Sequence, residues 1–252
     1  MHGKQKKVLL IGNGFLSKKI SAFLGRKKIV NIFCKNKGYF SINNLKRKIK
    51  TNYNLAIILF GKTSIKYCEQ FKSESFKINV KKTIEVIEIL KKENIKIIYI
   101  SSDIVFSGKK RLYYHNSKQD NNLQYGLQKT IIENRYKNDK NFCILRLSKI
   151  IDSSPNFFIR NENTKYESKI CAPILSKDVC LIIYKIINNF SPGIFQYSTS
   201  PLVFNDVLIK RKNKKKKIFF PKMYNNIFKN YKKTFENTSS GKIIKKIKNY
   251  EL

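Results

Sequence analysis

Short, continuous apolar runs alternate along the chain with stretches in which apolar residues recur at helical spacing. Each run is six or seven residues long, a pattern typical of strands buried on both faces of a sheet. The intervening stretches place apolar residues three and four positions apart, as amphipathic helices do. Strands that alternate with helices predict an α/β fold, namely a Rossmann-like doubly wound parallel sheet. The apolar runs lie at residues 7–12, 29–34, 55–60, 97–102 and 142–148.

Two glycines follow the first predicted strand and precede a predicted helix. In dinucleotide-binding sheets the first glycine permits a tight turn, and the second lets a pyrophosphate approach the amino end of the helix. Gly12 and Gly14 occupy these positions, and Ser17 stands where a third glycine is usual. The motif predicts a cofactor site, with a purely structural turn as the alternative. The residues expected to line this site are Gly12, Gly14, Phe15 and Leu16.

The residues after the second and third predicted strands bear on the choice of cofactor. An NAD site usually has a carboxylate after the second strand, which binds the ribose 2′-hydroxyl. This chain has Lys35 and Lys37 there instead, and their charges suit the 2′-phosphate of NADP. NADP is therefore favoured, and NAD stays possible. Gly61 follows the third run, where the backbone could pass close to a cofactor.

A hydroxyl, a phenol and an ammonium group follow the fourth predicted strand. Ser102 ends that strand, and Tyr125 and Lys129 lie four residues apart, on one face of the next predicted helix. A phenol titrates near pH 10, and a neighbouring ammonium is expected to lower that pKa. Tyr125 would then exchange a proton with a carbonyl oxygen to which Ser102 donates a hydrogen bond. Tyr-x-x-x-Lys also arises by chance among 14 tyrosines, so the argument for catalysis depends on the shared strand-end position of Ser102, Gly12 and Gly61.

The carboxyl-terminal part of the chain has a less regular pattern, and we expect a small substrate lobe there. Helices are predicted over 177–190 and over 201–212. Lysines dominate residues 210–217, and such runs are usually solvated, with a site for an anionic partner as the alternative. We therefore divide the chain into an NAD(P)-binding domain over 1–150 and a substrate lobe with a Lys-rich tail over 151–252.

Composition narrows the choice of partners. The 252 residues include 53 Lys and Arg against 16 Asp and Glu, a net charge of +37 that would attract polyanions. The basic residues are spread over the whole length, so nucleic-acid binding is not expected. Five cysteines without a Cys-x-x-Cys pair, together with two histidines, predict reduced thiols and no metal site. The apolar runs are shorter than the ~18 residues that span a bilayer, so we expect a cytoplasmic protein without a membrane span.

Seven stretches carry these motifs, namely VLLIGNGFLS, INVKKTIEVIEILKK, IYISSDIVFSG, YGLQK, ILRLS, APILSKDVCLIIYKII and GIFQYS. Together they resemble the extended short-chain dehydrogenase/reductases, and most closely their dTDP-4-dehydrorhamnose reductase branch. The resemblance implies a Rossmann domain that binds NADP and a small carboxyl-terminal substrate lobe. It also implies that Ser102, Tyr125 and Lys129 are the catalytic hydroxyl, proton donor and lysine, and that Tyr125 and Lys129 contact the cofactor.

The function implied by this resemblance is NADP-dependent reduction of a 4-keto sugar nucleotide, in the synthesis of a cell-surface polysaccharide. The expected partner is the nucleotide-sugar substrate, and a homodimer is one possible assembly. Two alternatives stay open. One is an epimerase or dehydratase that recycles the hydride internally. The other is a non-catalytic nucleotide-binding relative, which Ser17 and the short segment between Phe158 and Lys169 favour.

Overall fold

Contacts between residues divide the chain into two units. The first comprises Met1–Arg146 and Phe190–Gln196, and the second comprises Leu147–Asn189 and Tyr197–Leu252. The predicted catalytic and cofactor-binding residues all belong to the first unit. The computed structural model describes residues 7–25, 30–33, 40–50, 53–109, 113–152, 170–171, 174–198 and 202–203.

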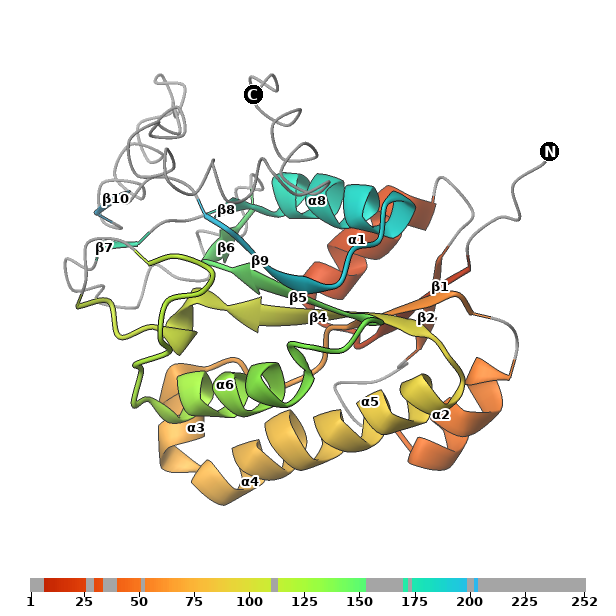
Figure 1. Ribbon diagram of the computed structural model, residues 1–252, viewed down its shortest axis with the longest axis horizontal. Coiled ribbons are helices and arrows are strands. Elements are labelled where there is room, and N and C mark those ends of the chain that lie inside the picture. The colour runs from red at the N-terminus through yellow and green to blue at the C-terminus, as the bar shows by residue number, and fades with distance from the viewer. Residues whose placement is uncertain are drawn as a thin grey trace. The chain divides into compact units, whose positions relative to one another are not determined.

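The main sheet of the structure has six strands in the order β2-β1-β3-β4-β5-β9 (Figure 1). Strands β1 to β4 pair in parallel, and Val8 of β1 lies between Val30 of β2 and Leu55 of β3. The doubly wound parallel sheet predicted from the sequence is therefore confirmed. The strands are β1 Val8–Ile11, β2 Val30–Phe33, β3 Leu55–Ile58, β4 Lys96–Ser102, β5 Phe142–Leu147 and β9 Gly193–Tyr197.

The order of the strands places a topological switch point between β1 and β3. The chain leaves β1 toward β2 on one side and returns to β3 on the other. In open α/β sheets ligands bind outside the carboxyl ends of the strands at such a point. The two strand ends stay close, because the Leu59 amide donates to the Ile11 carbonyl oxygen at 2.9 Å. The glycine turn at Gly12 and the loop at Gly61 follow these strands directly.

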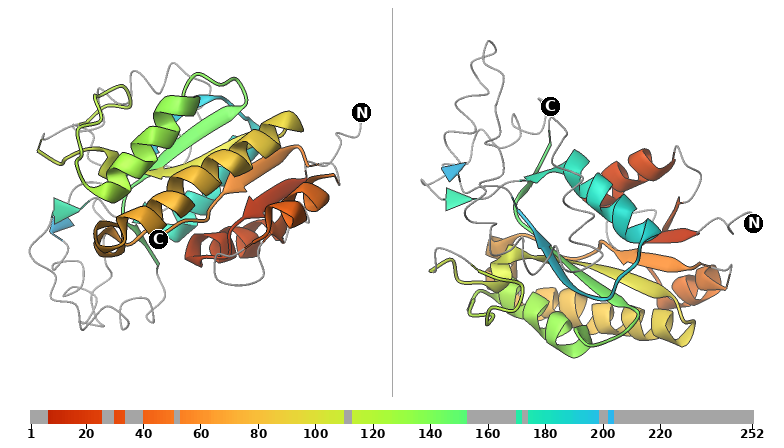
Figure 2. Two further views of the ribbon diagram at one scale, coloured as in Figure 1. Left: turned by 90° about the horizontal axis from the view of Figure 1, so that it is seen from below. Right: turned by 45° about the horizontal axis from the view of Figure 1, so that its top comes forward.

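Helices cover both faces of the sheet. α2, α5 and α6 lie on one face, and α1 lies on the other (Figures 1 and 2). The apolar sides of α2, α5 and α6 form one core with the strands, and Leu45, Leu90 and Ile132 are fully buried in it. Burial of these stripes explains the helical spacing of apolar residues in the sequence. The helices of this unit are α1 Phe15–Gly25, α2 Ile42–Ile49, α3 Ile65–Gln70, α4 Lys72–Phe76, α5 Thr83–Lys92 and α6 Gln124–Tyr136.

The helical segment between β3 and β4 contains an irregular turn. α4 continues into a π-helix, η1 (Lys77–Lys82), and then into α5. π-turns inside helices are rare and are often found at functional sites. This turn carries Asn79, a polar side chain that is only 6% exposed.

The second unit is described in part. β6 (Ile150–Ile151) pairs with β8 (Ile174–Leu175), and α8 (Ser176–Asn188) follows, close to its predicted range. The helix predicted from residue 201 is wrong at its start. Leu202–Val203 form strand β10, because they pair in antiparallel orientation with β7 (Ile170–Cys171), and such pairing overrides local propensity. Most of the substrate lobe predicted over 151–252, including residues 210–217, lies outside the described residues and stays a prediction.

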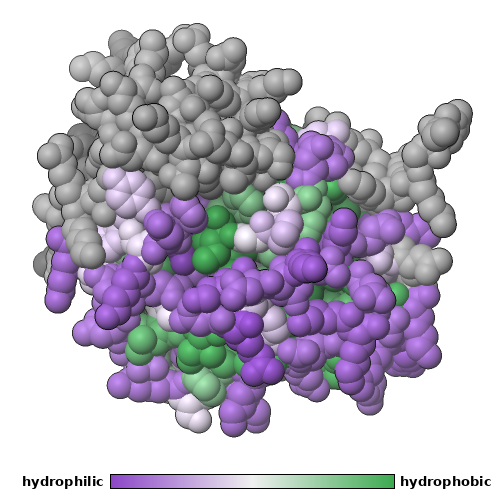
Figure 3. Space-filling model, in the orientation of Figure 1, coloured by the Kyte–Doolittle hydropathy of each residue, from purple (hydrophilic) through white to green (hydrophobic). Residues whose placement is uncertain are grey.

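The face of the described chain that Figure 3 shows is mainly polar. Figure 3 shows one side as mostly hydrophilic, with some apolar side chains collected over α6, whose Leu127 and Ile131 are 38% and 40% exposed. Among the residues that the structure describes, none of the helices combines the length and hydropathy that a membrane span requires.

Candidate active site

The turn after β1 requires glycine at its first position. Gly12 has φ +139°, a conformation that residues with a side chain rarely adopt. A Cβ atom at Gly12 would lie 2.8 Å from the backbone of both Leu59 and Phe60. The absence of a side chain therefore lets the turn pack directly against the segment that leaves β3.

Ser17 takes over part of the role of the missing third glycine. Its side chain is 1% exposed, and its hydroxyl donates to the Gly12 carbonyl oxygen at 2.6 Å. This bond ties the first turn of α1 to the end of β1. A Cβ atom at Gly14 would meet no atom of the described chain within 4 Å, apart from adjacent residues. The turn is thus closely packed at Gly12 and open at Gly14.

This contrast predicts a large effect on stability for one alanine substitution and a small effect for another. Gly12→Ala is expected to lower the free energy of unfolding by at least about 1–3 kcal/mol, because it combines a strained φ with a backbone clash. Gly14→Ala is the matched control and should change that free energy by less than about 0.5 kcal/mol. Urea denaturation of both variants measures the difference. Equal effects would show that the close approach at Gly12 is absent.

Asn79 fixes the loop that follows β3. Its side-chain oxygen accepts a hydrogen bond from the Lys62 amide at 2.7 Å, and its nitrogen donates to the Lys62 carbonyl oxygen at 2.9 Å. The same nitrogen donates to Gln128 Oε1 of α6 at 2.7 Å. A Cβ atom at Gly61, where φ is +147°, would lie 3.0 Å from the Asn79 oxygen. Asn79 therefore holds the Gly61 loop against α6, a role that the sequence analysis missed.

Ser102 lies at the carboxyl end of β4 and closes a short turn. Its hydroxyl accepts a hydrogen bond from the Ile104 amide at 3.3 Å and lies 3.1 Å from Asp103 Oδ1, to which it donates. These bonds cap the 3₁₀ turn η2 (Asp103–Val105). The side chain is partly exposed, so a ligand at this edge of the sheet could reach its oxygen.

Tyr125 and Lys129 lie in the first two turns of α6, and both are nearly buried. Tyr125 is 8% exposed and Lys129 is 9% exposed. Lys129 Nζ donates to the Ile100 carbonyl oxygen of β4 at 2.8 Å. It also lies 4.5 Å from the centre of the Tyr99 ring and 5.7 Å from that of Tyr125. The lysine therefore connects the tyrosine to the strand that ends at Ser102.

Gly126 allows this end of α6 to approach the turn η2, which follows β4, closely. A Cβ atom there would collide with the Ile104 carbonyl oxygen and would lie 3.1 Å from Asn121 Cγ. The residue adjoins Tyr125, so the close approach brings the phenol toward the turn after Ser102. The sequence analysis did not single out Gly126, because its need for glycine depends on a neighbour 22 positions earlier in the chain.

Burial has the largest effect on the pKa values of Tyr125 and Lys129. It raises the pKa of Tyr125 above its usual value of 10.0, and the negative charges of Cys68 and Asp103 in their ionised forms add to the effect. Burial lowers the pKa of Lys129 to about 8, although Glu133 and Cys68 partly oppose it. The expectation that Lys129 would lower the pKa of Tyr125 is therefore not met. Desolvation of the phenolate outweighs the attraction of one ammonium group.

The low pKa of Lys129 predicts a stability effect with a definite sign. Between about 8 and its ordinary 10.5, the unfolded chain holds the proton that the folded chain has lost, so the free energy of unfolding rises with pH. The gain is at most about 3 kcal/mol. Lys129→Met lacks this term, so the stability of the wild type relative to the variant should increase from about pH 8 to about pH 10. Urea denaturation across that range tests it, and a constant difference would contradict it.

The structure thus brings the predicted residues to one edge of the sheet. Gly12 and Gly61 follow β1 and β3, and Ser102 ends β4, the third of these parallel neighbours. Tyr125 and Lys129 lie on α6, and Lys129 is bonded to β4. Lys35 lies outside the described residues. Among the described cysteines, Cys68, Cys143 and Cys180 are buried. The described residues contain no group of three or more His, Cys, Asp or Glu arranged to hold a metal ion.

Comparisons with solved structures reveal several relatives of the same fold. A dTDP-4-dehydrorhamnose reductase from Bacillus anthracis in complex with NADP is 21% identical with a TM-score of 0.72, over 83% of this chain and 81% of that chain. A hypothetical dTDP-4-dehydrorhamnose reductase from Sulfolobus tokodaii is 21% identical with a TM-score of 0.71, over 83% and 82%. The UDP-glucose 4-epimerase of Thermotoga maritima with UDP-glucose is 15% identical with a TM-score of 0.69, over 82% and 81%.

The sequence of the chain matches a family model but no individual curated protein. No curated protein matches the chain. The family model described as the RmlD substrate binding domain matches residues 6–169, which include every strand and helix of the candidate site. The chain therefore belongs to the RmlD substrate-binding domain family, within the extended short-chain dehydrogenase/reductases.

Proposed function

We propose that this protein is an NADP-dependent reductase of a 4-keto sugar nucleotide, acting in the synthesis of a cell-surface polysaccharide. One observation supports this most: the Lys129 ammonium lies 5.7 Å from the Tyr125 ring while it is bonded to Ile100, two residues before Ser102. This arrangement supports roles for Tyr125 as proton donor, for Lys129 as cation and for Ser102 as hydroxyl at one edge of the sheet. The Bacillus anthracis relative, a dTDP-4-dehydrorhamnose reductase in complex with NADP, suggests the substrate class and the cofactor.

Tyr125 is suited to donate a proton to a carbonyl oxygen during reduction. Its phenol is protonated at neutral pH, because its pKa lies above the usual value of 10.0. A carbonyl oxygen gains negative charge as its carbon is reduced, and a phenol within hydrogen-bonding distance can then transfer its proton. Ser102 would donate a hydrogen bond to the same oxygen and orient the substrate. For this, the Ser102 hydroxyl must turn from Asp103 toward the ligand.

Lys129 would support this transfer as a charge. With a pKa of about 8, it is mainly an ammonium at neutral pH and neutral in alkali. The ammonium stabilises the phenolate that Tyr125 becomes after it gives up its proton. We expect turnover to fall as pH rises through the pKa of Lys129.

The turn after β1 fits the pyrophosphate of a dinucleotide. The space at Gly14 is open, and the first turn of an α-helix offers backbone amides without intrahelical acceptors. When bound, the cofactor supplies the hydride for the carbonyl carbon. Lys35 would bind the 2′-phosphate that distinguishes NADP from NAD. The other residues proposed to hold the cofactor are Gly12, Gly14, Phe15, Leu16, Gly61, Tyr125 and Lys129.

Calorimetric titration with NADPH and NADH tests the cofactor proposal. We expect NADPH to bind more tightly than NADH, and Lys35→Ala to reduce that preference. Gly14→Ala should weaken the binding of both, because its methyl group would occupy the space meant for the pyrophosphate. Failure of the wild type to bind either dinucleotide would exclude a reductase.

Two other functions predict different outcomes when the protein is incubated with NADPH and a nucleotide sugar. Similarity to UDP-glucose 4-epimerases favours an enzyme that recycles its hydride, which would convert the sugar without net loss of NADPH. A non-catalytic relative would bind the cofactor and convert nothing. A reductase consumes one NADPH for each sugar that it reduces.

A further inference from the structure

Glu133 continues the line of Tyr125 and Lys129 along α6. The three residues are spaced by four positions, so they lie on one side of the helix. Glu133 is 0% exposed, although carboxylates are almost never fully buried unless they are paired. The proposed reaction assigns this side chain no role.

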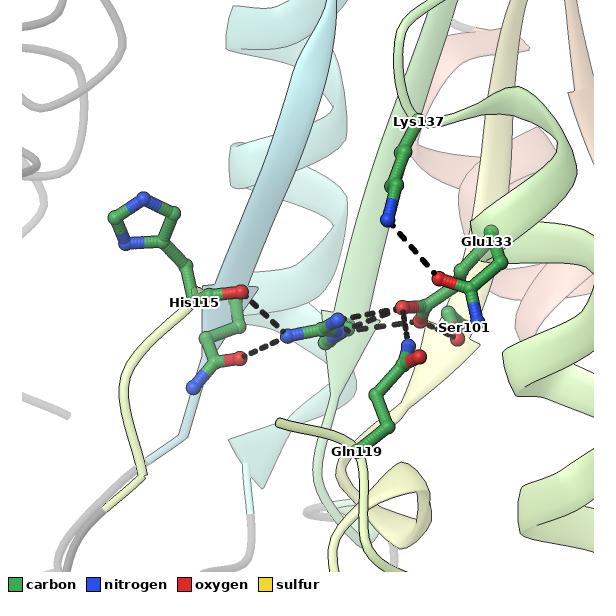
Figure 4. A network of polar contacts seen from close by, with 8 residues as sticks. Ser101, His115, Gln119, Glu133 and Lys137 are labelled. Atoms are coloured by element: carbon green, nitrogen blue, oxygen red, sulfur yellow. Dashed lines mark hydrogen bonds and ion pairs between the residues drawn. The ribbon is translucent and has the colours of Figure 1, made fainter. Parts of the chain in front are cut away.

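The Glu133 carboxylate is saturated with donors from three other segments (Figure 4). Arg146 of β5 is 2% exposed and lies 2.5 Å from Glu133 Oε2 through Nη2, and its Nε lies 3.0–3.1 Å from both carboxylate oxygens. Ser101 of β4 donates to Oε1 at 2.5 Å. Gln119, in the loop between β4 and α6, donates to Oε2 at 2.5 Å.

The bond from Ser101 links Glu133 to the proposed catalytic hydroxyl. Ser101 and Ser102 are consecutive and form the carboxyl end of β4. A hydrogen bond that holds Ser101 against α6 therefore fixes the position of the strand end to which Ser102 belongs. The same carboxylate belongs to the helix that carries Tyr125 and Lys129.

Arg146 extends this connection to the loop after β4. Its Nη1 donates to the His115 carbonyl oxygen at 3.0 Å and to Gln196 Oε1 at 3.1 Å. Its guanidinium also lies 5.0 Å from the centre of the Phe106 ring. One buried ion pair thus joins β4, β5, α6 and the intervening loop.

We propose that Glu133 is a positioning residue that locks the carboxyl end of β4 to α6 and so sets the placement of Ser102 relative to Tyr125 and Lys129. This rests on the function proposed above. The carboxylate also favours the ammonium form of Lys129. The other titratable groups that face this lysine are Tyr99 on β4, Tyr125 on α6 and Cys68 on α3, and Arg146 on β5 faces Glu133 itself.

The first experiment measures steady-state kinetics of Glu133→Gln, Ser101→Ala and Glu88→Gln. Glu88→Gln is the matched control, because Glu88 also pairs with an arginine, Arg135, but is 43% exposed and lies on α5. Glu133→Gln is expected to lower kcat about 100-fold, since small misplacements of reacting groups have effects of that size. Ser101→Ala keeps the ion pair and should lower kcat about 10-fold. KM should change less than about threefold in both, and Glu88→Gln should match the wild type.

A purely structural role gives a different pattern. The variants would then unfold at lower temperature, but the kcat of the folded protein would equal that of the wild type, and this result would overturn the proposal. Should Glu133→Gln fail to fold, Ser101→Ala carries the same test of the link between β4 and α6.

A second experiment does not depend on turnover. The rate at which acetic anhydride acetylates Lys129, followed by mass spectrometry as a function of pH, reports the titration of its amine. Loss of the Glu133 charge in Glu133→Gln leaves Arg146 uncompensated, and both changes disfavour the ammonium, so the midpoint should move to lower pH. An unchanged midpoint would refute the influence of Glu133 on Lys129. If the wild type reduces no sugar but the midpoint moves, the proposed function fails while the coupling stands.

Discussion

Replacement of Tyr125 by phenylalanine is expected to lower turnover by about 10²–10⁴-fold, the contribution typical of a positioned general acid. The aromatic ring and its packing are retained, so the affinity for NADPH should stay within about threefold of the wild type. Steady-state kinetics and calorimetric titration of the same preparation measure both quantities.

Tyr136→Phe is the matched control for this substitution. Tyr136 belongs to the same helix and is 3% exposed, but its hydroxyl donates to Glu88, away from the candidate site. Its removal should leave turnover nearly unchanged. Equal turnover of Tyr125→Phe and the wild type would remove Tyr125 from the reaction.

Removal of Arg146 should have the largest effect on stability. Arg146→Ala leaves Glu133 as a buried carboxylate without its counter-charge, and the breaking of such a pair costs about 3–5 kcal/mol. Arg135→Ala is the control, because its partner Glu88 is half exposed and the Arg135 side chain is 54% exposed. Surface pairs of that kind contribute about 0–1 kcal/mol. Urea denaturation compares the two variants, and similar losses would contradict the importance of the buried pair.

The fold could be predicted because its signals are local. Each buried strand is a short apolar run, and each covering helix repeats apolar residues at helical spacing. β3 and α5 can therefore be predicted without knowledge of the elements that pack against them. Leu202–Val203 show the limit of this approach. They form a strand because they pair with Ile170–Cys171, and the local sequence around residue 202 does not indicate this pairing.

The candidate site could be predicted only in part, for a similar reason. Ser102, Tyr125 and Lys129 stand out through their chemistry and spacing. Asn79 contributes through its hydrogen bonds with Lys62, and Gly126 through its close approach to Ile104. Neither contact can be predicted from the local sequence. A polar residue on the buried side of an otherwise apolar helical pattern was the one signal that could have found Asn79.

The pKa of Tyr125 illustrates a second limit. Spacing correctly places an ammonium near the phenol, at 5.7 Å between Nζ and the ring centre. It does not reveal that the phenol is almost fully buried, which decides the direction of the shift. A protonated Tyr125 is compatible with reduction, in which the phenol begins as the donor.

The central claim is that this protein transfers hydride from NADPH to the keto carbon of a sugar nucleotide. The most direct measurement incubates it with NADPH that carries two deuterium atoms at the nicotinamide C4 position and with a dTDP-linked 4-keto-6-deoxy sugar, followed by mass spectrometry of the product. We expect a reduced sugar that carries one deuterium for each NADPH oxidised, and little or no product from Tyr125→Phe. An unlabelled epimer, or intact NADPH beside unreduced substrate, would contradict the claim.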